Sequence, residues 1–162
     1  EIKVQETRLA IEQGASEVDM VINIGDLKSG DDRLVLSDIQ GVVKACHEEG
    51  AICKVIIECV LLTEAEKVRA CALVREAGAD FIKTSTGKVA PAATMPVTLV
   101  MLEAIRDYYY DTGKKIGMKP AGGIATSKLA IQYLVVLRET LGNDWLTPDL
   151  FRFGASSLAV FP

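Results

Sequence analysis

Charged residues interrupt several apolar, strand-like segments of this sequence. Lys54 lies in CKVIIE, Lys83 in DFIKTSTGK and Lys119 in IGMKPAGG, and Asp19 lies within EVDMVIN. Lysine is almost never fully buried unless it is paired or has a chemical use. Residues two apart share a strand face, so Lys54 and Glu58 point to the same side of their strand. If the charged faces of these strands point to one interior, the charges converge there.

Each lysine has a structural and a catalytic explanation. A buried ion pair with a carboxylate such as Asp19 or Glu58 is the favoured explanation for Lys54. Catalysis is favoured for Lys83 and Lys119, because both stand at C-terminal strand ends, where barrel enzymes keep their active sites. An ammonium beside a second ammonium loses its proton more easily, and the neutral amine can attack a carbonyl to form an imine.

This pair predicts Schiff-base chemistry of the aldolase kind. One lysine would be the nucleophile, while the other would stay charged and help to move protons. Asp19 can supply the remaining proton relay, alone or through a bound water. The residue types alone do not decide which of the two lysines attacks the substrate.

A second group of residues has the character of a phosphate site. Barrels often bind phosphate with the loops after the last two strands and a helix N-terminus. The candidates are Gly122 and Gly123, then Gly154, Ser156 and Ser157, with Thr86, Gly87 and Lys88 adding a hydroxyl, a backbone N–H and a positive charge. A Gly-Gly pair alone is weak evidence because turns use glycine constantly. The loops together indicate a phosphorylated small-molecule substrate.

Five apolar segments must position these residues, at 17–23, 53–58, 80–84, 116–119 and 151–154. Each gap between them holds a helix-length stretch. Strands that alternate with helices predict parallel strands joined by right-handed crossovers.

The predicted helices have recognisable ends. Thr63 followed by Glu66 is a capping box, and Thr126 or Ser127 can cap the helix before the last strand. A further helix runs from about Met95 to Asp111. Glycines close the helices by adopting the left-handed conformation. These are Gly14, Gly50, Gly78, Gly113 and Gly142.

We predict an α/β fold of the TIM-barrel type, in which residues 1–162 form one incomplete domain with strands 4 to 8. A closed eight-unit barrel typically needs ~250 residues, and here the first helix has no strand before it. A missing front end is the simplest explanation. A five-stranded doubly wound sheet is the alternative.

Composition and charge exclude several classes of partner. The net charge of −4 comes from interspersed signs, so no basic run is available for nucleic acid. No apolar run approaches the ~20 residues of a membrane helix. Four cysteines without a C-x-x-C pair indicate reduced thiols and a cytoplasmic location. No residue cluster has metal-ligand spacing, and the single histidine, His47, is expected at the surface.

The segments DFIKTSTGK, GMKPAGGI and FRFGASS closely resemble, in order, the motifs of the deoxyribose-phosphate aldolase family, and EVDMVIN and KVIIE extend the resemblance. It implies an eight-stranded β/α barrel that reversibly cleaves 2-deoxy-D-ribose 5-phosphate to D-glyceraldehyde 3-phosphate and acetaldehyde, without a metal or organic cofactor. It also implies that Lys83 forms the imine, that Lys119 is the second active-site lysine and that Asp19 relays protons. The implied phosphate-binding positions are Gly87, Lys88, Gly122, Gly123, Gly154, Ser156 and Ser157.

The sequence departs from the family pattern in two loops. Ala125 follows Ile124 where the family commonly has arginine, and Cys59 and Val60 follow Glu58 where Thr-Gly is common. Two alternatives to this aldolase therefore stay open. One is a Schiff-base aldolase with another phosphorylated substrate. The other is a non-catalytic phospho-sugar-binding or assembly fragment, which would pair with a second copy or with a complementing N-terminal segment.

Overall fold

The computed structural model describes residues 1–156 and 158 of the chain. Its centre is a sheet of four parallel strands in the order β1-β2-β3-β4. The strands are β1 (Glu17–Val21), β2 (Ile52–Ile56), β3 (Phe81–Lys83) and β4 (Gly117–Lys119). Spatial order equals chain order, as in a β/α barrel, whereas a doubly wound sheet reverses order at a switch point. The doubly wound alternative is therefore wrong.

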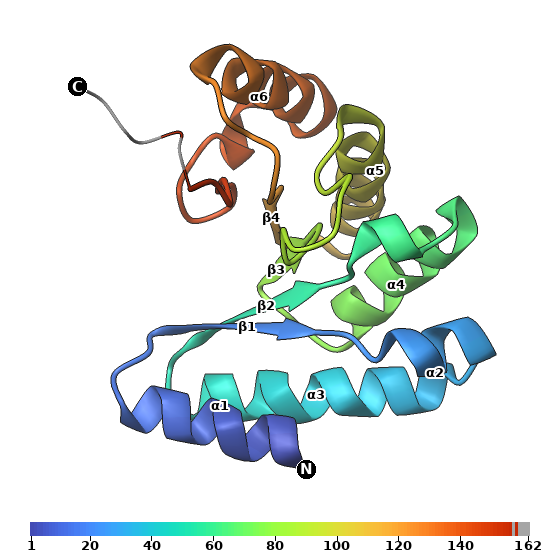
Figure 1. Ribbon diagram of the computed structural model, residues 1–162, viewed down its shortest axis with the longest axis vertical. Coiled ribbons are helices and arrows are strands. Elements are labelled where there is room, and N and C mark those ends of the chain that lie inside the picture. Colours follow the sequence, from blue (N-terminus) through green and yellow to red (C-terminus); the bar gives the residue numbers. More distant parts are fainter. Residues whose placement is uncertain (157, 159–162) are drawn as a thin grey trace.

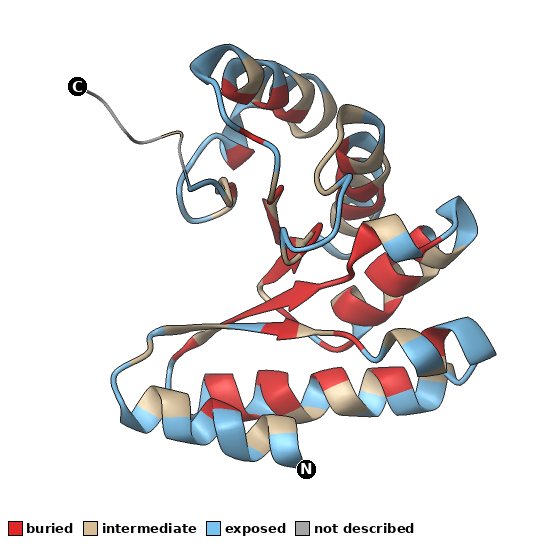
Figure 2. Ribbon diagram, viewed as in Figure 1, coloured by how far each residue is buried: buried red, intermediate tan, exposed pale blue. Residues whose placement is uncertain are grey.

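The helices lie along one side of the curved row of strands (Figure 1). They are α1 (Ile2–Glu12), α2 (Ile24–Ser29), α3 (Asp32–Glu48), α4 (Glu64–Glu76), α5 (Met95–Thr112) and α6 (Ser127–Leu141), with short 3-10 turns η1 (Cys59–Leu61) and η2 (Asn143–Trp145). Buried residues concentrate on the strands and on the helix sides that face them (Figure 2).

The predicted helix ends are confirmed where side-chain chemistry defines them. Thr63 and Glu66 form the capping box of α4, and the Thr126 hydroxyl accepts a hydrogen bond from the backbone N–H of Leu129 at the start of α6. Gly113 closes α5 in the left-handed conformation. The short helix α2 was not expected, because six residues are too few to show a helical period.

The segment 151–154 corrects the prediction of a fifth strand. It lies parallel to β4 but makes only two isolated bridges, Met118 with Phe151 and Ala121 with Gly154. A strand needs consecutive ladder positions, and only the first and last residues of this segment are bridged. Its place beside β4 is as predicted, whereas its regularity is not.

Strand register separates an apolar face from a charged face. Val55, Ile82 and Met118 are register neighbours that point toward the helices, and all are fully buried. The opposite face carries Asp19 paired in register with Lys54. Because alternate residues point to opposite sides of a strand, the hydrophobic packing under the helices also directs the charged residues to the concave side.

Candidate active site

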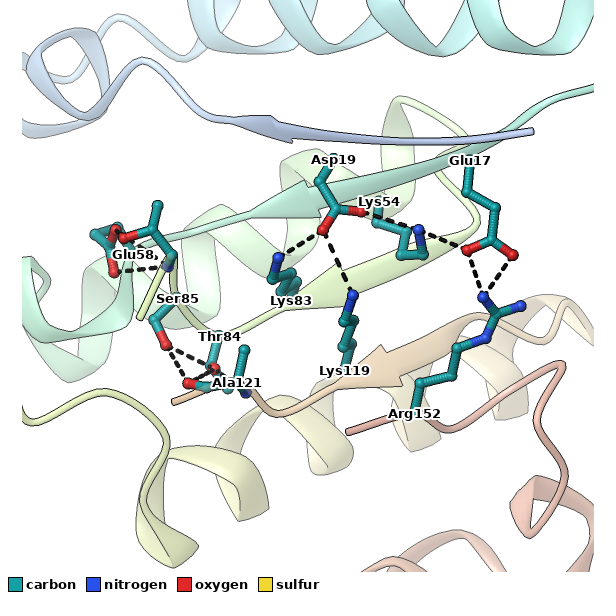
Figure 3. A network of polar contacts seen from close by, with 11 residues as sticks. Glu17, Asp19, Lys54, Glu58, Lys83, Thr84, Ser85, Lys119, Ala121 and Arg152 are labelled. Carbon is teal, nitrogen blue, oxygen red and sulfur yellow. Dashed lines mark hydrogen bonds and ion pairs between the residues drawn. The ribbon is translucent and has the colours of Figure 1, made fainter. Parts of the chain in front are cut away.

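Asp19, Lys83 and Lys119 meet on the concave face of the sheet (Figure 3). Lys83 and Lys119 are register partners on β3 and β4, so their side chains leave the sheet next to each other. The Lys83 Nζ lies 2.5 Å from Asp19 Oδ2, and the Lys119 Nζ lies 3.6 Å from the same oxygen. The structure therefore brings together the three residues predicted to be catalytic.

Lys54 has the ion-pairing environment expected for it. Its Nζ lies 2.9 Å from Asp19 Oδ1 and 2.8 Å from Glu17 Oε2, and only 3% of the residue is exposed. Glu17, rather than Glu58, is its second partner. Glu17 also accepts hydrogen bonds from the guanidinium of Arg152, which joins the segment after β4 to β1.

Sequence reasoning does not single out Glu17 or Arg152. The two-residue spacing between Glu17 and Asp19 is a signal that could have identified Glu17, because it places both carboxylates on one strand face. Arg152 lies in a segment without strand regularity, so no such period identifies it.

The electrostatic balance differs between the groups of this cluster. Burial raises the pKa of Asp19, but hydrogen bonds from Lys83 and Lys54 outweigh that effect and lower it to about 2. Hydrogen bonds from Arg152 and Lys54 lower the pKa of Glu17 to about 2. Both carboxylates are therefore ionised at neutral pH, as the relay role of Asp19 requires.

Lys119 is the less well compensated lysine of the predicted catalytic pair. Burial lowers its pKa, and the positive charges of Lys83 and Lys54 add to that effect against the opposing charge of Asp19. The compensation is incomplete because Asp19 Oδ2 lies 3.6 Å from the Lys119 Nζ, farther than its 2.5 Å from the Lys83 Nζ.

A cavity of about 490 Å³ opens beside Lys83. The predicted substrate-binding residues that line it are Thr86, Gly87, Gly122, Gly123, Gly154 and Ser156. Lys88 is exposed and does not line the cavity, although it follows Gly87 directly. Asp19 contacts both Lys83 and Lys119, and neither Asp19 nor Lys119 lines the cavity. Ser157 lies outside the described residues.

Two of these glycines allow the loops to approach closely. A Cβ on Gly122, whose φ is 86°, would collide with the Ala92 side chain. A Cβ on Gly154 would collide with Ala121. Glycine at 122 thus lets the loop after β4 approach the loop after β3, and glycine at 154 lets the segment 151–154 approach the loop after β4.

The wall around Lys83 is also tied together by hydroxyl groups. The Ser85 hydroxyl donates to the carbonyl of Ala121 at 2.6 Å, and the Thr84 hydroxyl accepts from the Ala121 N–H at 2.9 Å. These bonds connect the loop after β3 to the loop after β4. Thr84 and Ser85 belong to the motif around Lys83, but their polarity alone does not predict this role.

The described residues also bear on three further predictions, which concern a metal site, a membrane-spanning helix and the exposure of His47. Within residues 1–156 and 158, no group of three or more His, Cys, Asp and Glu residues is placed to hold a metal ion. No helix in the described part of the chain has the length and hydropathy needed to cross a membrane. His47 is exposed, and its Nε2 lies 2.9 Å from Asp80 Oδ2.

Comparison with known proteins identifies relatives of this chain. The chain is 48% identical over 159 residues to mouse deoxyribose-phosphate aldolase, covering 96% of this chain and 49% of that protein. It is 51% identical over 144 residues to deoxyribose-phosphate aldolase of Thermococcus gammatolerans, covering 89% of this chain and 61% of that protein. The chain thus spans about half the length of its mammalian relatives.

The architecture agrees with these relatives. The solved structure of deoxyribose-phosphate aldolase from Aeropyrum pernix superposes with a TM-score of 0.69 at 27% identity, covering 95% of this chain and 56% of that one. The TIM-barrel prediction is thus confirmed for the part of the barrel that this chain contains. The family described as DeoC/LacD family aldolase matches residues 1–142. With its paired lysines beside a glycine-walled cavity, the chain belongs to the DeoC/LacD family of aldolases.

Proposed function

We propose that this chain carries the catalytic residues of a class I aldolase that cleaves 2-deoxy-D-ribose 5-phosphate reversibly through an imine on Lys83. One observation carries the proposal. The Lys83 side chain lines the cavity, while its Nζ contacts Asp19 at 2.5 Å beside Lys119. The nucleophile is thus accessible to a substrate and is also in contact with groups that can move protons.

In this reaction the protonated imine formed on Lys83 accepts the electron pair of the bond that breaks. The neutral amine of Lys83 attacks the aldehyde carbon of the open-chain sugar, and loss of that oxygen as water gives the protonated imine. Removal of the proton from the third-carbon hydroxyl then breaks the bond between the second and third carbons. The electron pair enters an enamine, and D-glyceraldehyde 3-phosphate leaves. Protonation of the enamine and hydrolysis release acetaldehyde and restore the amine.

Asp19 and Lys119 move protons during these steps. Asp19 is ionised and contacts the Lys83 nitrogen, so it can exchange a proton with the carbinolamine directly or through water. Burial lowers the pKa of Lys119, so this lysine gives up its proton more readily than an ordinary lysine and can serve as a second proton-transfer group. Lys54 holds the other oxygen of Asp19 and leaves Oδ2 for this exchange.

The glycine-walled side of the cavity binds the phosphate in this proposal. Gly122, Gly123, Gly154 and Ser156 line it, and Ser156 offers a hydroxyl donor. Gly87 lies against Gly122 in the same lining, and the exposed Lys88 next to it adds positive charge nearby. Ala125 lies in the lining, so this wall has no guanidinium at the position where the family commonly has one.

Imine trapping tests the proposal directly. The folded protein is incubated with acetaldehyde and borohydride, and the modified lysine is located by peptide mass mapping. We expect an ethyl group on Lys83, no trapping in Lys83→Arg, and unchanged trapping in Lys67→Arg, whose lysine is buried on α4 beside Glu64. Modification of Lys119 in place of Lys83 would overturn the assignment of the nucleophile. A different substrate would be revealed by comparing cleavage rates across sugar phosphates.

The assembly and location of the protein are also proposals. In the described sheet β1 has a partner on one side only, which supports pairing with a complementing N-terminal segment or with a second copy. A monomer in sedimentation that melts cooperatively would contradict obligatory pairing. The four cysteines are free, which supports a reducing, cytoplasmic location.

A further inference from the structure

Glu58 has an unusual environment at the end of β2. It is the only described residue other than glycine with a left-handed backbone, at φ 48°, and only 4% of it is exposed. Side chains rarely adopt this conformation, which persists only where surrounding contacts enforce it. Burial of a carboxylate also requires compensating hydrogen bonds. The hydrogen-bond partners of the Glu58 carboxylate are therefore among the contacts that stabilise this conformation.

The described hydrogen bonds to the Glu58 carboxylate all come from Thr86. The Thr86 hydroxyl donates to Glu58 Oε2 at 2.6 Å, and the Thr86 N–H lies 3.2 Å and 3.3 Å from Oε1 and Oε2. Thr86 lines the cavity together with Lys83. Glu58 itself does not line the cavity, so it can affect a substrate only through Thr86.

The donor and acceptor positions of the Thr86 hydroxyl that remain free follow from the partners that it already has. A threonine hydroxyl has one donor hydrogen and two acceptor lone pairs. Glu58 occupies the hydrogen, and the backbone N–H of Lys88 donates to one lone pair at 3.2 Å. One lone pair remains for a ligand. Thr86 therefore presents an acceptor to the cavity, although its residue type also allows a donor.

We propose that Glu58 is a positioning residue that holds Thr86 as a hydrogen-bond acceptor, so that Thr86 binds a substrate hydroxyl rather than the phosphate. A phosphate dianion offers acceptor oxygens only and gains nothing from an acceptor lone pair. The phosphate is then left to the donors of other lining residues, the backbone of Gly122 and Gly123 and the hydroxyl of Ser156.

This inference rests on the proposed aldolase function and specifies its acceptor aldehyde. The aldehyde should carry a hydroxyl next to its carbonyl, as D-glyceraldehyde 3-phosphate does. The synthesis direction gives the sharpest comparison. Acetaldehyde is combined with D-glyceraldehyde 3-phosphate, with the same aldehyde lacking the hydroxyl (3-phosphooxypropanal), or with D-glyceraldehyde, which lacks the phosphate. The two ratios of kcat/KM report hydroxyl selection and phosphate selection separately.

We expect the parent protein to prefer the hydroxylated phosphate by about tenfold, the size of one well-placed hydrogen bond. Thr86→Val should remove most of that preference, and Thr86→Ser should retain it. Glu58→Gln should weaken it, because its amide can donate to the Thr86 hydroxyl and use the lone pair that binds the substrate. Phosphate selection should change less than twofold in all three. Thr98→Val, a threonine buried on α5, is the matched control and should leave both ratios unchanged.

Two outcomes would overturn the proposal while leaving the aldolase function in place. One is a loss of phosphate selection in Thr86→Val with hydroxyl selection intact. The other is full hydroxyl selection in both Thr86→Val and Glu58→Gln. Acetaldehyde trapping on Lys83 is measured in every variant, because it needs neither group. Failure of trapping in the parent protein would instead contradict the proposed function itself.

Discussion

Lys83 and Lys119 are register partners on neighbouring parallel strands, and the same carboxylate oxygen of Asp19 lies 2.5 Å from one and 3.6 Å from the other. This relationship makes the two lysines unequal. Asp19 compensates the nearer charge more strongly, while burial and two neighbouring ammonium groups lower the pKa of Lys119.

Removing the second ammonium should change the pH dependence of imine formation. Lys119→Leu deletes a positive charge beside Lys83 and leaves Asp19 to Lys83 and Lys54 alone. We expect trapping with acetaldehyde and borohydride at pH 7 to slow by about tenfold, with the rate profile displaced by roughly one pH unit to higher pH. Lys128→Leu, on the exposed side of α6, removes a lysine far from the cluster and is the control. A profile that coincides with the parent would contradict this role for Lys119.

The ion pairs of Asp19 should make stability depend on pH in acid. The pKa of Asp19 is about 2 in the folded protein and 3.8 ordinarily, so its stabilisation is fully present above about pH 4 and is lost as the pH falls toward 2. We expect Asp19→Asn to cost about 1 to 2 kcal/mol at pH 6, after allowance for solvent screening. The difference should shrink toward pH 2. Urea unfolding of both proteins across this range measures it, and a constant difference would exclude the linkage.

Removing one partner of the Lys54–Glu17 ion pair should destabilise the protein more than removing both partners together. Glu17→Gln leaves the buried ammonium of Lys54 with Asp19 as its single described carboxylate partner. We expect a loss of about 2 kcal/mol in the free energy of unfolding, because an under-compensated buried charge is costly. Lys54→Met combined with Glu17→Gln should be more stable than Glu17→Gln alone.

A matched control for this cycle is Glu103→Gln, which removes an ion pair with Arg106 on α5 and should change stability by less than about 0.5 kcal/mol. Denaturant unfolding at pH 7 measures the parent, Glu17→Gln, Lys54→Met, the double variant and the Glu103→Gln control. Simple additivity of the Glu17 and Lys54 substitutions would show that the two residues are not coupled.

The close approach at Gly154 should matter for the phosphorylated substrate in particular. Gly154→Ala places a methyl group against Ala121 and pushes two cavity walls apart. We expect KM for deoxyribose 5-phosphate to rise by about tenfold, an effect of roughly 1.4 kcal/mol. Trapping of acetaldehyde on Lys83 should be nearly unchanged, because it needs no phosphate contact. Gly25→Ala on α2, where a Cβ meets only an ordinary contact, controls for glycine replacement.

Local sequence patterns were sufficient to predict most helices and strands and most residues of the candidate site. Recurring apolar segments and helix caps predicted the four strands and the ends of α4, α5 and α6, because both signals depend on neighbours in the chain. Charged residues within or at the end of these apolar segments identified Lys83, Lys119 and Asp19. Which lysine attacks came from the family resemblance, since two lysines at equivalent strand ends look alike in sequence.

Tertiary structure decided which groups pair. Lys54 contacts Glu17 and Asp19. Glu58, which follows Lys54 in the same segment of the chain, accepts a hydrogen bond from Thr86 instead. Arg152 reaches Glu17 across 135 positions of sequence. Alternation determines the face on which a side chain stands. Its partner depends on register between strands and on the conformation of the loop after each strand, and no local pattern of residues encodes either.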